Sequence, residues 1–167
     1  PFDLYVAANF GSDSATLRLA NGAAWTLGGN ETIGALADKT AQLANGTALV
    51  VLGSNTLSVD GPGNGNNTGF GGVISGGVAS GLSKSGAGTL TLAGANTYTG
   101  TTTVDAGTLA VSGSLASATL QVNNGGSLAL LAPQVLDAGA RLTVASGGTA
   151  SLTGAQALGG LALAGSL

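Results

Sequence analysis

The chain is built from short runs in which apolar and polar residues alternate. In the runs Thr89-Leu90-Thr91-Leu92 and Thr108-Leu109-Ala110-Val111, the second and fourth side chains are aliphatic. A period of two is typical of a β-strand with one buried face and one wetted face. The alternation therefore predicts two strands here, each with these two side chains directed into a core.

A strand–turn–strand unit recurs along the chain, each time with two apolar pairs on either side of a turn. The three copies are Leu17-x-Leu19 with Trp25-x-Leu27, Leu120-x-Val122 with Leu128-x-Leu130, and Leu142-x-Val144 with Ala150-x-Leu152. The same interval carries the second copy onto the third, from Leu120 to Leu142 and from Leu128 to Ala150. Internal periods of about 20 residues with this content indicate a solenoid.

Three such strands with their bends make one rung, meaning one complete winding of the chain. The spacing predicts an all-β, three-faced parallel β-helix of roughly seven rungs, formed by residues 1–167 as a single domain. No segment has a sustained apolar period of 3.6 residues, and the abundant glycine disfavours helix. An immunoglobulin-type sandwich also uses short strands with frequent turns, but it has no reason to repeat one unit.

The pattern also indicates where the chain leaves the core. The stretch Asp60–Thr68 (DGPGNGNNT) lacks aliphatic residues and predicts a loop protruding from the rod. Pro133 has no backbone donor and is expected at a corner between faces. In residues 41–59 the inward candidates are Leu43, Leu49, Val51, Leu57 and Val59, and the last rungs are expected to close with Leu158, Leu161 and Leu163.

Glycine punctuates the strands between residues 81 and 111. These positions are expected where the chain turns sharply or adopts a positive φ, because glycine lacks a Cβ. The five glycines concerned are Gly86, Gly88, Gly94, Gly100 and Gly107.

Residues 81–111, GLSKSGAGTLTLAGANTYTG followed by TTTVDAGTLAV, closely resemble the autotransporter-associated β-strand repeat. This repeat occurs in passenger domains of type V secreted proteins of Gram-negative bacteria. Residues 33–36, 55–59 and 70–76 are similar to the family's lead-in. The resemblance implies a right-handed parallel β-helix, exported through the outer membrane to the cell surface. The implied partners are the rest of the passenger and its own outer-membrane translocator barrel, and no activity is implied.

Composition excludes several other classes of protein. Only 7% of the residues are charged, and the 31 glycines lack the every-third-residue order of collagen. Every apolar run is shorter than the ~18–20 residues of a membrane-spanning helix. The net charge is −3 and the four basic residues are scattered, so nucleic acid is not an expected partner. Methionine is absent and no signal peptide is recognisable, so we expect a fragment of a longer protein.

The residue inventory limits the possible chemistry. Histidine and cysteine are absent, which excludes Ser-His-Asp and Cys-His catalysis and the usual zinc sites. Asp38 and Asp60 are separated by the same interval as Leu120 and Leu142 and would meet if they were rung neighbours, although solvated turn acids are the simpler interpretation. Residues 60–65 lack the terminal glutamate of a calcium-binding EF-hand loop. The threonine run at 99–103 is too short for an ice-binding array. We expect no catalytic residue, cofactor or metal.

The remaining candidates for binding are few. Trp25 shares the parity of Leu27 and is expected in the core, and Tyr98 is expected to pack at a corner. The protruding loop is where we expect any partner contact, because loops tolerate variable binding residues. The candidate contact residues are Asp60, Asn64, Asn66, Asn67 and Thr68.

These observations predict a non-enzymatic stalk or spacer in a cell-surface autotransporter passenger, which supports export, folding and display. One alternative is an adhesin segment, associated with virulence, that binds a host glycan, protein or matrix ligand. Another is the spacer of a larger enzyme, such as a protease with its catalytic domain outside this segment. Because a cut rod exposes strand edges and core, the segment is also expected to associate end to end with itself.

Overall fold

The computed structural model describes residues 3–4, 16–38, 47–61 and 67–167. Within these ranges the chain forms short β-strands joined by turns, and every strand pair is parallel. No helix in this part of the chain is long and apolar enough to cross a bilayer. The strands stack as a β-solenoid of about seven rungs, so the predicted all-β fold is confirmed.

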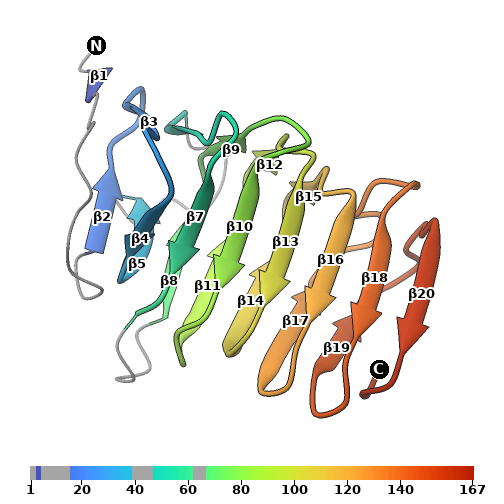
Figure 1. Ribbon diagram of the computed structural model, residues 1–167. Helices are drawn as coiled ribbons and strands as arrows, with labels where there is room; N and C mark the ends of the chain where they lie inside the picture. The colour runs from blue at the N-terminus through green and yellow to red at the C-terminus, as the bar shows by residue number, and fades with distance from the viewer. Residues whose placement is uncertain (1–2, 5–15, 39–46, 62–66) are drawn as a thin grey trace.

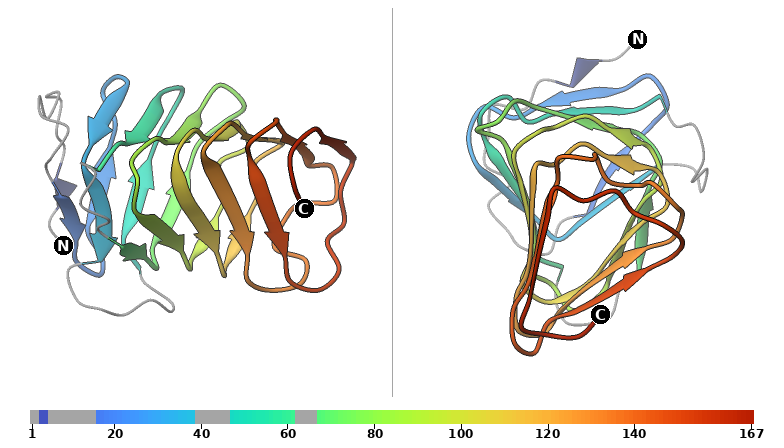
Figure 2. Two further views of the ribbon diagram at one scale, coloured as in Figure 1. Left: turned by 90° about the horizontal axis from the view of Figure 1, so that it is seen from below. Right: turned by 90° about the vertical axis from the view of Figure 1, so that its right-hand side faces the viewer.

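Each rung visits three faces in a fixed order, which makes the cross-section roughly triangular (Figure 2). Seen from the C-terminal end, the chain winds anticlockwise as it approaches the viewer, so the solenoid is right-handed. We number the faces 1, 2 and 3 in the order that the chain follows. The observed fold is therefore the three-faced parallel β-helix that the spacing predicts, with the right-handed winding that the resemblance implies.

Face 1 is a seven-stranded sheet that extends along the rod (Figure 1). Each strand comes from a different rung, which agrees with the roughly seven rungs expected. Like positions in successive rungs lie side by side in register. The strands of face 1 are β4 (Glu31–Ile33), β7 (Thr56–Val59), β10 (Gly81–Lys84), β13 (Thr101–Val104), β16 (Thr119–Val122), β18 (Arg141–Val144) and β20 (Gly160–Leu163).

Two columns of inward side chains run along face 1, with one residue from each rung. Burial of each aliphatic side chain in such a column contributes roughly 1.5–3 kcal/mol. Glu31, Lys84 and Thr102 are the polar members. One column contains Glu31, Leu57, Leu82, Thr102, Leu120, Leu142 and Leu161, and the other Ile33, Val59, Lys84, Val104, Val122, Val144 and Leu163.

Face 2 follows face 1 around a corner. It consists of a five-stranded sheet and the pair β2–β5, of which β5 lies against β8. Leu90, Leu92, Leu109 and Val111 point inward and are fully buried, as the alternation predicts. The strands of face 2 are β2 (Thr16–Leu19), β5 (Ala35–Asp38), β8 (Thr68–Phe70), β11 (Thr89–Leu92), β14 (Gly107–Val111), β17 (Gly126–Leu130) and β19 (Thr149–Leu152).

Face 3 returns the chain to face 1 through strands of only two or three residues. Trp25, Val50 and Ile74 are register partners in three successive rungs, and all three are fully buried. The indole therefore lies in the core, as expected. The strands of face 3 are β1 (Asp3–Leu4), β3 (Ala24–Thr26), β6 (Leu49–Val51), β9 (Val73–Ser75), β12 (Ala95–Asn96) and β15 (Ser114–Leu115).

One set of inward candidates is partly wrong. Leu49 and Val51 flank the buried Val50 and lie on the outer side of β6, where both are half-buried. An uninterrupted apolar run has no polar member to reveal its parity, and here packing beside Trp25 decides it. Leu57 and Val59 do point inward. The remaining candidate, residue 43, lies outside the described residues.

The predicted repeat interval is confirmed for two copies of the repeated unit. Leu120 pairs with Leu142 across face 1, and Leu128 pairs with Ala150 across face 2. The copy at residues 17–27 is different, because its strands β2 and β3 lie on faces 2 and 3. Equal spacing between strands occurs at more than one corner, so spacing does not reveal which faces a unit occupies.

Several glycines are required because successive rungs approach closely at the corners. A Cβ on Gly94 would lie 1.9 Å from the Gly72 carbonyl oxygen, and one on Gly100 would lie 1.7 Å from that of Ser80. Positive φ occurs at Gly107, with a value of 65°, but not at Gly94 or Gly100. The backbone of the preceding rung, more than local turn geometry, therefore excludes a side chain there.

The end of the chain follows the expected pattern. Pro133 lies in a turn at the corner between faces 2 and 3, as predicted. Leu158 packs partly against the core. Leu161 and Leu163 occupy the inward columns of face 1 but are 50% and 48% exposed, because they lie in the terminal strand of the described sheet.

Candidate functional site at the corner between faces 1 and 2

The two ends of the predicted contact loop are anchored to neighbouring rungs. Asp60 follows β7, and its backbone N–H donates to the Ile33 carbonyl oxygen at 2.9 Å. Asn67 is exposed, and its Oδ1 accepts a hydrogen bond from the backbone N–H of Thr89 at 3.0 Å. These side-chain and backbone contacts hold the two described ends of the predicted loop to the rungs on either side.

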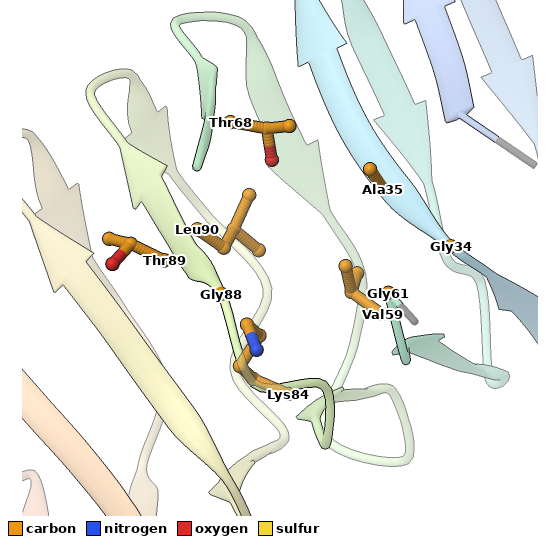
Figure 3. A pocket seen from close by; sticks show the side chains of 9 residues that line it. All are labelled: Gly34, Ala35, Val59, Gly61, Thr68, Lys84, Gly88, Thr89 and Leu90. Carbon is orange, nitrogen blue, oxygen red and sulfur yellow. The ribbon is translucent and has the colours of Figure 1, made fainter. Parts of the chain in front are cut away.

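Thr68 is the first residue of β8, so the predicted loop extends too far at this end. It pairs with the inward-facing Leu90, and Figure 3 shows it among the residues that line a small cavity. Asn64 and Asn66 lie outside the described residues. Contact between this loop and a partner therefore stays a prediction.

Lys84 is the buried cation at this corner. Its side chain is 3% exposed in an inward column that otherwise holds aliphatic residues. Nζ donates a hydrogen bond to the carbonyl oxygen of Gly86, in its own rung. It donates a second one, 3.4 Å long, to the carbonyl oxygen of Ala106, in the next rung. Burial lowers the pKa of Lys84 from its ordinary value, and the negative charge of Asp60 opposes this shift. The ammonium thus joins two rungs through backbone carbonyls.

The cavity beside Lys84 is small and lies between neighbouring rungs (Figure 3). Its volume of about 10 Å³ is close to the smallest that holds one water molecule. Three successive rungs line it, represented by Ala35, Thr68 and Leu90. An organic substrate does not fit in this space, so the cavity is not a substrate site.

A wider groove of about 330 Å³ lies on the outer surface at the corner between faces 2 and 3. Its lining is made of small or aliphatic residues such as Gly94, Ala95 and Gly113, with a single hydroxyl from Ser114. It presents no charged side chain and no aromatic ring. The residues that line this groove therefore do not indicate a particular ligand.

Asp38 and Asp60 do not meet, as the simpler interpretation held, but Asp38 is buried in a strand and is not a solvated turn acid. Asp38 lies in β5 on face 2, pairs with Leu19, and accepts a hydrogen bond from the Gly71 backbone N–H at 2.8 Å through Oδ2. Asp60 follows β7 on face 1, next to Ile33 of the preceding rung. The interval between the two acids does not make them rung neighbours, because the rung from β4 to β7 is longer and pairs Ile33 with Val59.

Asp105 is the best-connected carboxylate of the described corner. Its Oδ1 accepts a hydrogen bond from Asn123 Nδ2 at 2.6 Å, and its Oδ2 accepts one from the Ser83 hydroxyl at 3.3 Å. These contacts join three successive rungs on the outside of the rod. Within the described ranges, no group of three or more acidic, histidine or cysteine side chains is placed to hold a metal ion.

The aromatic side chains of the described residues belong to the core. Trp25, Phe70 and Tyr98 are each 0% exposed. The Tyr98 hydroxyl lies 2.7 Å from Thr102 Oγ1 in a buried hydrogen bond, so its expected structural role at a corner is confirmed. Thr102 itself is buried, so the threonine run at 99–103 is not a flat outward array.

Burial raises the pKa of Tyr98 from its ordinary value of 10.0, and the hydrogen bond to Thr102 offsets only part of this shift. Above pH 10 the unfolded chain loses this proton while the native chain keeps it, so stability falls as the pH rises. We expect the Tyr98 contribution to cost about 1.4 kcal/mol at about pH 11. Urea unfolding of the parent chain and of Tyr98→Phe, compared at about pH 9 and about pH 11, measures it. An identical loss in both proteins would contradict this assignment.

Lys84 is the residue that sequence reasoning misses. In the sequence, Lys84 is one of four basic residues that lie far apart as single charges. The available signal is the alternation of inward and outward positions. Lys84 follows the inward Leu82 by two positions, as Val59 follows Leu57 in the matching strand. A charged residue at an inward position marks a place where the core must supply hydrogen-bond acceptors.

The geometry defines a parallel β-solenoid wall with polar corners and buried aromatic residues. Residues 82–111 match the model of the family described as the passenger-associated-transport-repeat. The chain therefore carries an autotransporter passenger repeat, as the resemblance indicated, and the matched segment includes Lys84 and Tyr98. This family implies secretion to the surface of Gram-negative bacteria. Comparison with curated proteins and with solved structures returns no match.

Proposed function

We propose that this chain is a non-enzymatic stalk within an autotransporter passenger, which supports export and folding and displays other regions at the cell surface. The observation that carries the proposal is the combination of one continuous solenoid core with the passenger repeat at residues 82–111. The stalk projects from the outer membrane, through which its own translocator barrel exports it.

The way in which the rungs contact one another supports a role in export. The strand pairs on each face join neighbouring rungs, so each completed rung presents the edge on which the next one pairs. A chain that emerges gradually can therefore fold rung by rung without a distant partner. Such folding outside the cell would favour export.

The surface of the described residues supports a stalk over an adhesin that binds glycans. Sugar rings are commonly recognised by exposed aromatic side chains that offer an apolar surface with a polar edge. Trp25, Phe70 and Tyr98 are all buried. Outward positions on face 1 instead carry small hydroxyl side chains such as Ser58, Ser83 and Thr103, which are only partly exposed.

Replacement of loop residues distinguishes a stalk from an adhesin. Residues 62–66 are replaced by a Gly-Ser linker of equal length in the chain fused to an autotransporter translocator, which leaves Asp60, Asn67 and Thr68 in place. We expect unchanged surface display, and we expect that neither protein binds host cells or matrix at micromolar concentration. Binding by the parent chain that disappears in the linker variant would replace the stalk by the adhesin.

We also propose that the chain, expressed by itself, associates end to end. Strand β20 has a neighbour on one side only, and Leu161 and Leu163 beside this open edge are about half exposed. An open edge and an uncovered core favour pairing with a second copy.

We expect the sedimentation of the chain to depend on its concentration, and we expect this dependence to weaken in Leu161→Asp. The control is Val78→Asp, because Val78 is 85% exposed in the segment between β9 and β10. A parent chain that sediments as a monomer at all concentrations would contradict association.

A further inference from the structure

Two polar side chains that break the apolar columns meet at one place in the wall. Lys84 interrupts the second inward column of face 1. Thr68 occupies an inward position of face 2, beside Leu90. Both side chains line the cavity of about 10 Å³ at the corner, and Figure 3 shows them on neighbouring strands around it. The placement of two polar groups at the same small void needs a physical explanation.

The hydrogen bonds of Lys84 leave the ammonium incompletely satisfied by the protein. A lysine ammonium has three N–H donors. Two of them reach the carbonyl oxygens of Gly86 and Ala106, which belong to the rung of Lys84 and to the next rung. The cavity lies toward the preceding rungs, which contribute Ala35, Val59 and Thr68. The third donor is therefore available on the side of the cavity.

The cavity has the size and polarity of a hydration site. A void of about this volume accommodates one water molecule when at least two polar partners are available. Here the partners are the ammonium of Lys84, which only donates, and the hydroxyl of Thr68, which donates or accepts. The remaining lining consists of glycine backbone, aliphatic groups such as Val59 and Leu90, and Thr89, which lies on the outer side of its strand. Larger anions do not fit, and the ammonium repels metal cations.

We propose that this cavity binds a single long-lived water molecule. The water accepts a hydrogen bond from Lys84 Nζ and donates one to Thr68 Oγ1. It completes the hydrogen bonding of a buried ammonium, which would otherwise be costly in the core. It also joins the rung that contains β8 to the rung that contains β10, at the base of the predicted loop.

The site is tested by oxygen-17 magnetic relaxation dispersion of water on the folded chain, which detects internal waters that stay bound longer than the protein tumbles. Thr68→Val removes the hydroxyl at nearly constant shape, and Lys84→Met removes the ammonium. We expect each variant to lose the dispersion amplitude of one water. Thr102→Val is the matched control, because Thr102 is also an inward threonine but bonds to Tyr98. Its amplitude should equal that of the parent chain.

A double-mutant cycle provides a second, independent readout. If the water bridges the two groups, removing both costs less than the sum of the separate losses, and the unfolding constants show a coupling of about threefold or more. Should Lys84→Met fail to fold, the dispersion of Thr68→Val alone decides the matter. Unchanged dispersion in Thr68→Val, or an amplitude that falls equally in Thr102→Val, would overturn the proposal.

Discussion

Replacement of Gly100 by alanine is expected to destabilise the solenoid severely, by about 3 kcal/mol or more. The added Cβ would lie 1.7 Å from the carbonyl oxygen and 2.7 Å from the carbonyl carbon of Ser80 in the preceding rung. This oxygen accepts the backbone N–H of Thr101 at 3.2 Å. Because the obstacle is backbone and not the end of a flexible side chain, relief requires the two rungs to separate.

Gly77 provides the matched control for this substitution. A Cβ there would meet nothing within 4 Å, and Gly77 does not have a positive φ. Gly77→Ala is therefore expected to change the unfolding free energy by no more than about 1 kcal/mol, in the stabilising direction. Urea unfolding of both variants makes the comparison. Equal stability of the two alanine variants would show that the rungs are not as close at Gly100 as the structure indicates.

Removal of one whole rung is expected to preserve the fold. The register pairs Gly107 with Gly126 and Thr108 with Ser127. Deletion of residues 108–126 therefore joins Gly107 directly to Ser127, in the position that Thr108 normally occupies. Leu90 then faces Leu128 in place of Leu109, and the inward columns remain aliphatic. A solenoid loses roughly one rung and one interface in this deletion. The shortened chain should retain its β circular dichroism and unfold cooperatively at lower urea concentration.

Removal of part of the same rung is expected to abolish folding. Deletion of residues 108–116 starts at the same place but brings the strand of face 1 onto face 2. Every later strand of the affected rungs then meets the wrong neighbour, and each corner falls where the preceding rung has a strand. Loss of cooperative unfolding is the expected result. A partial-rung deletion as stable as the whole-rung deletion would contradict the observed strand registers.

Much of the fold follows from the local alternation and the repeated unit. The period of two at Leu90 and Leu92 identifies inward residues because polar threonines mark the other side of the strand. The run Leu49-Val50-Val51 has no such marker, so only packing against Trp25 decides which residue is buried. The interval between Leu120 and Leu142 does not hold between all rungs, because corners differ in length.

The candidate site is less accessible to sequence reasoning. The exposed end of the loop at Asn67 can be expected from composition, whereas the inward direction of Thr68 depends on its pairing with Leu90. The alternation places Lys84 at an inward position. The carbonyl oxygens that accept its hydrogen bonds, however, belong to Gly86 and Ala106 at the corners. Contacts between backbone groups of different rungs are set by register, which a single sequence does not display.

The central claim is that successive rungs stack in parallel along one axis. Thr32, Ser58, Ser83 and Thr143 lie in one outward column of face 1. Because the natural chain has no cysteine, spin labels are attached at engineered cysteines, one at position 143 and the other at 83, 58 or 32. Electron–electron distances should rise by about 4.8 Å per rung, with backbone separations of about 14, 19 and 24 Å. Distances that fail to rise steadily along this series, as two facing antiparallel sheets would produce, would contradict the solenoid.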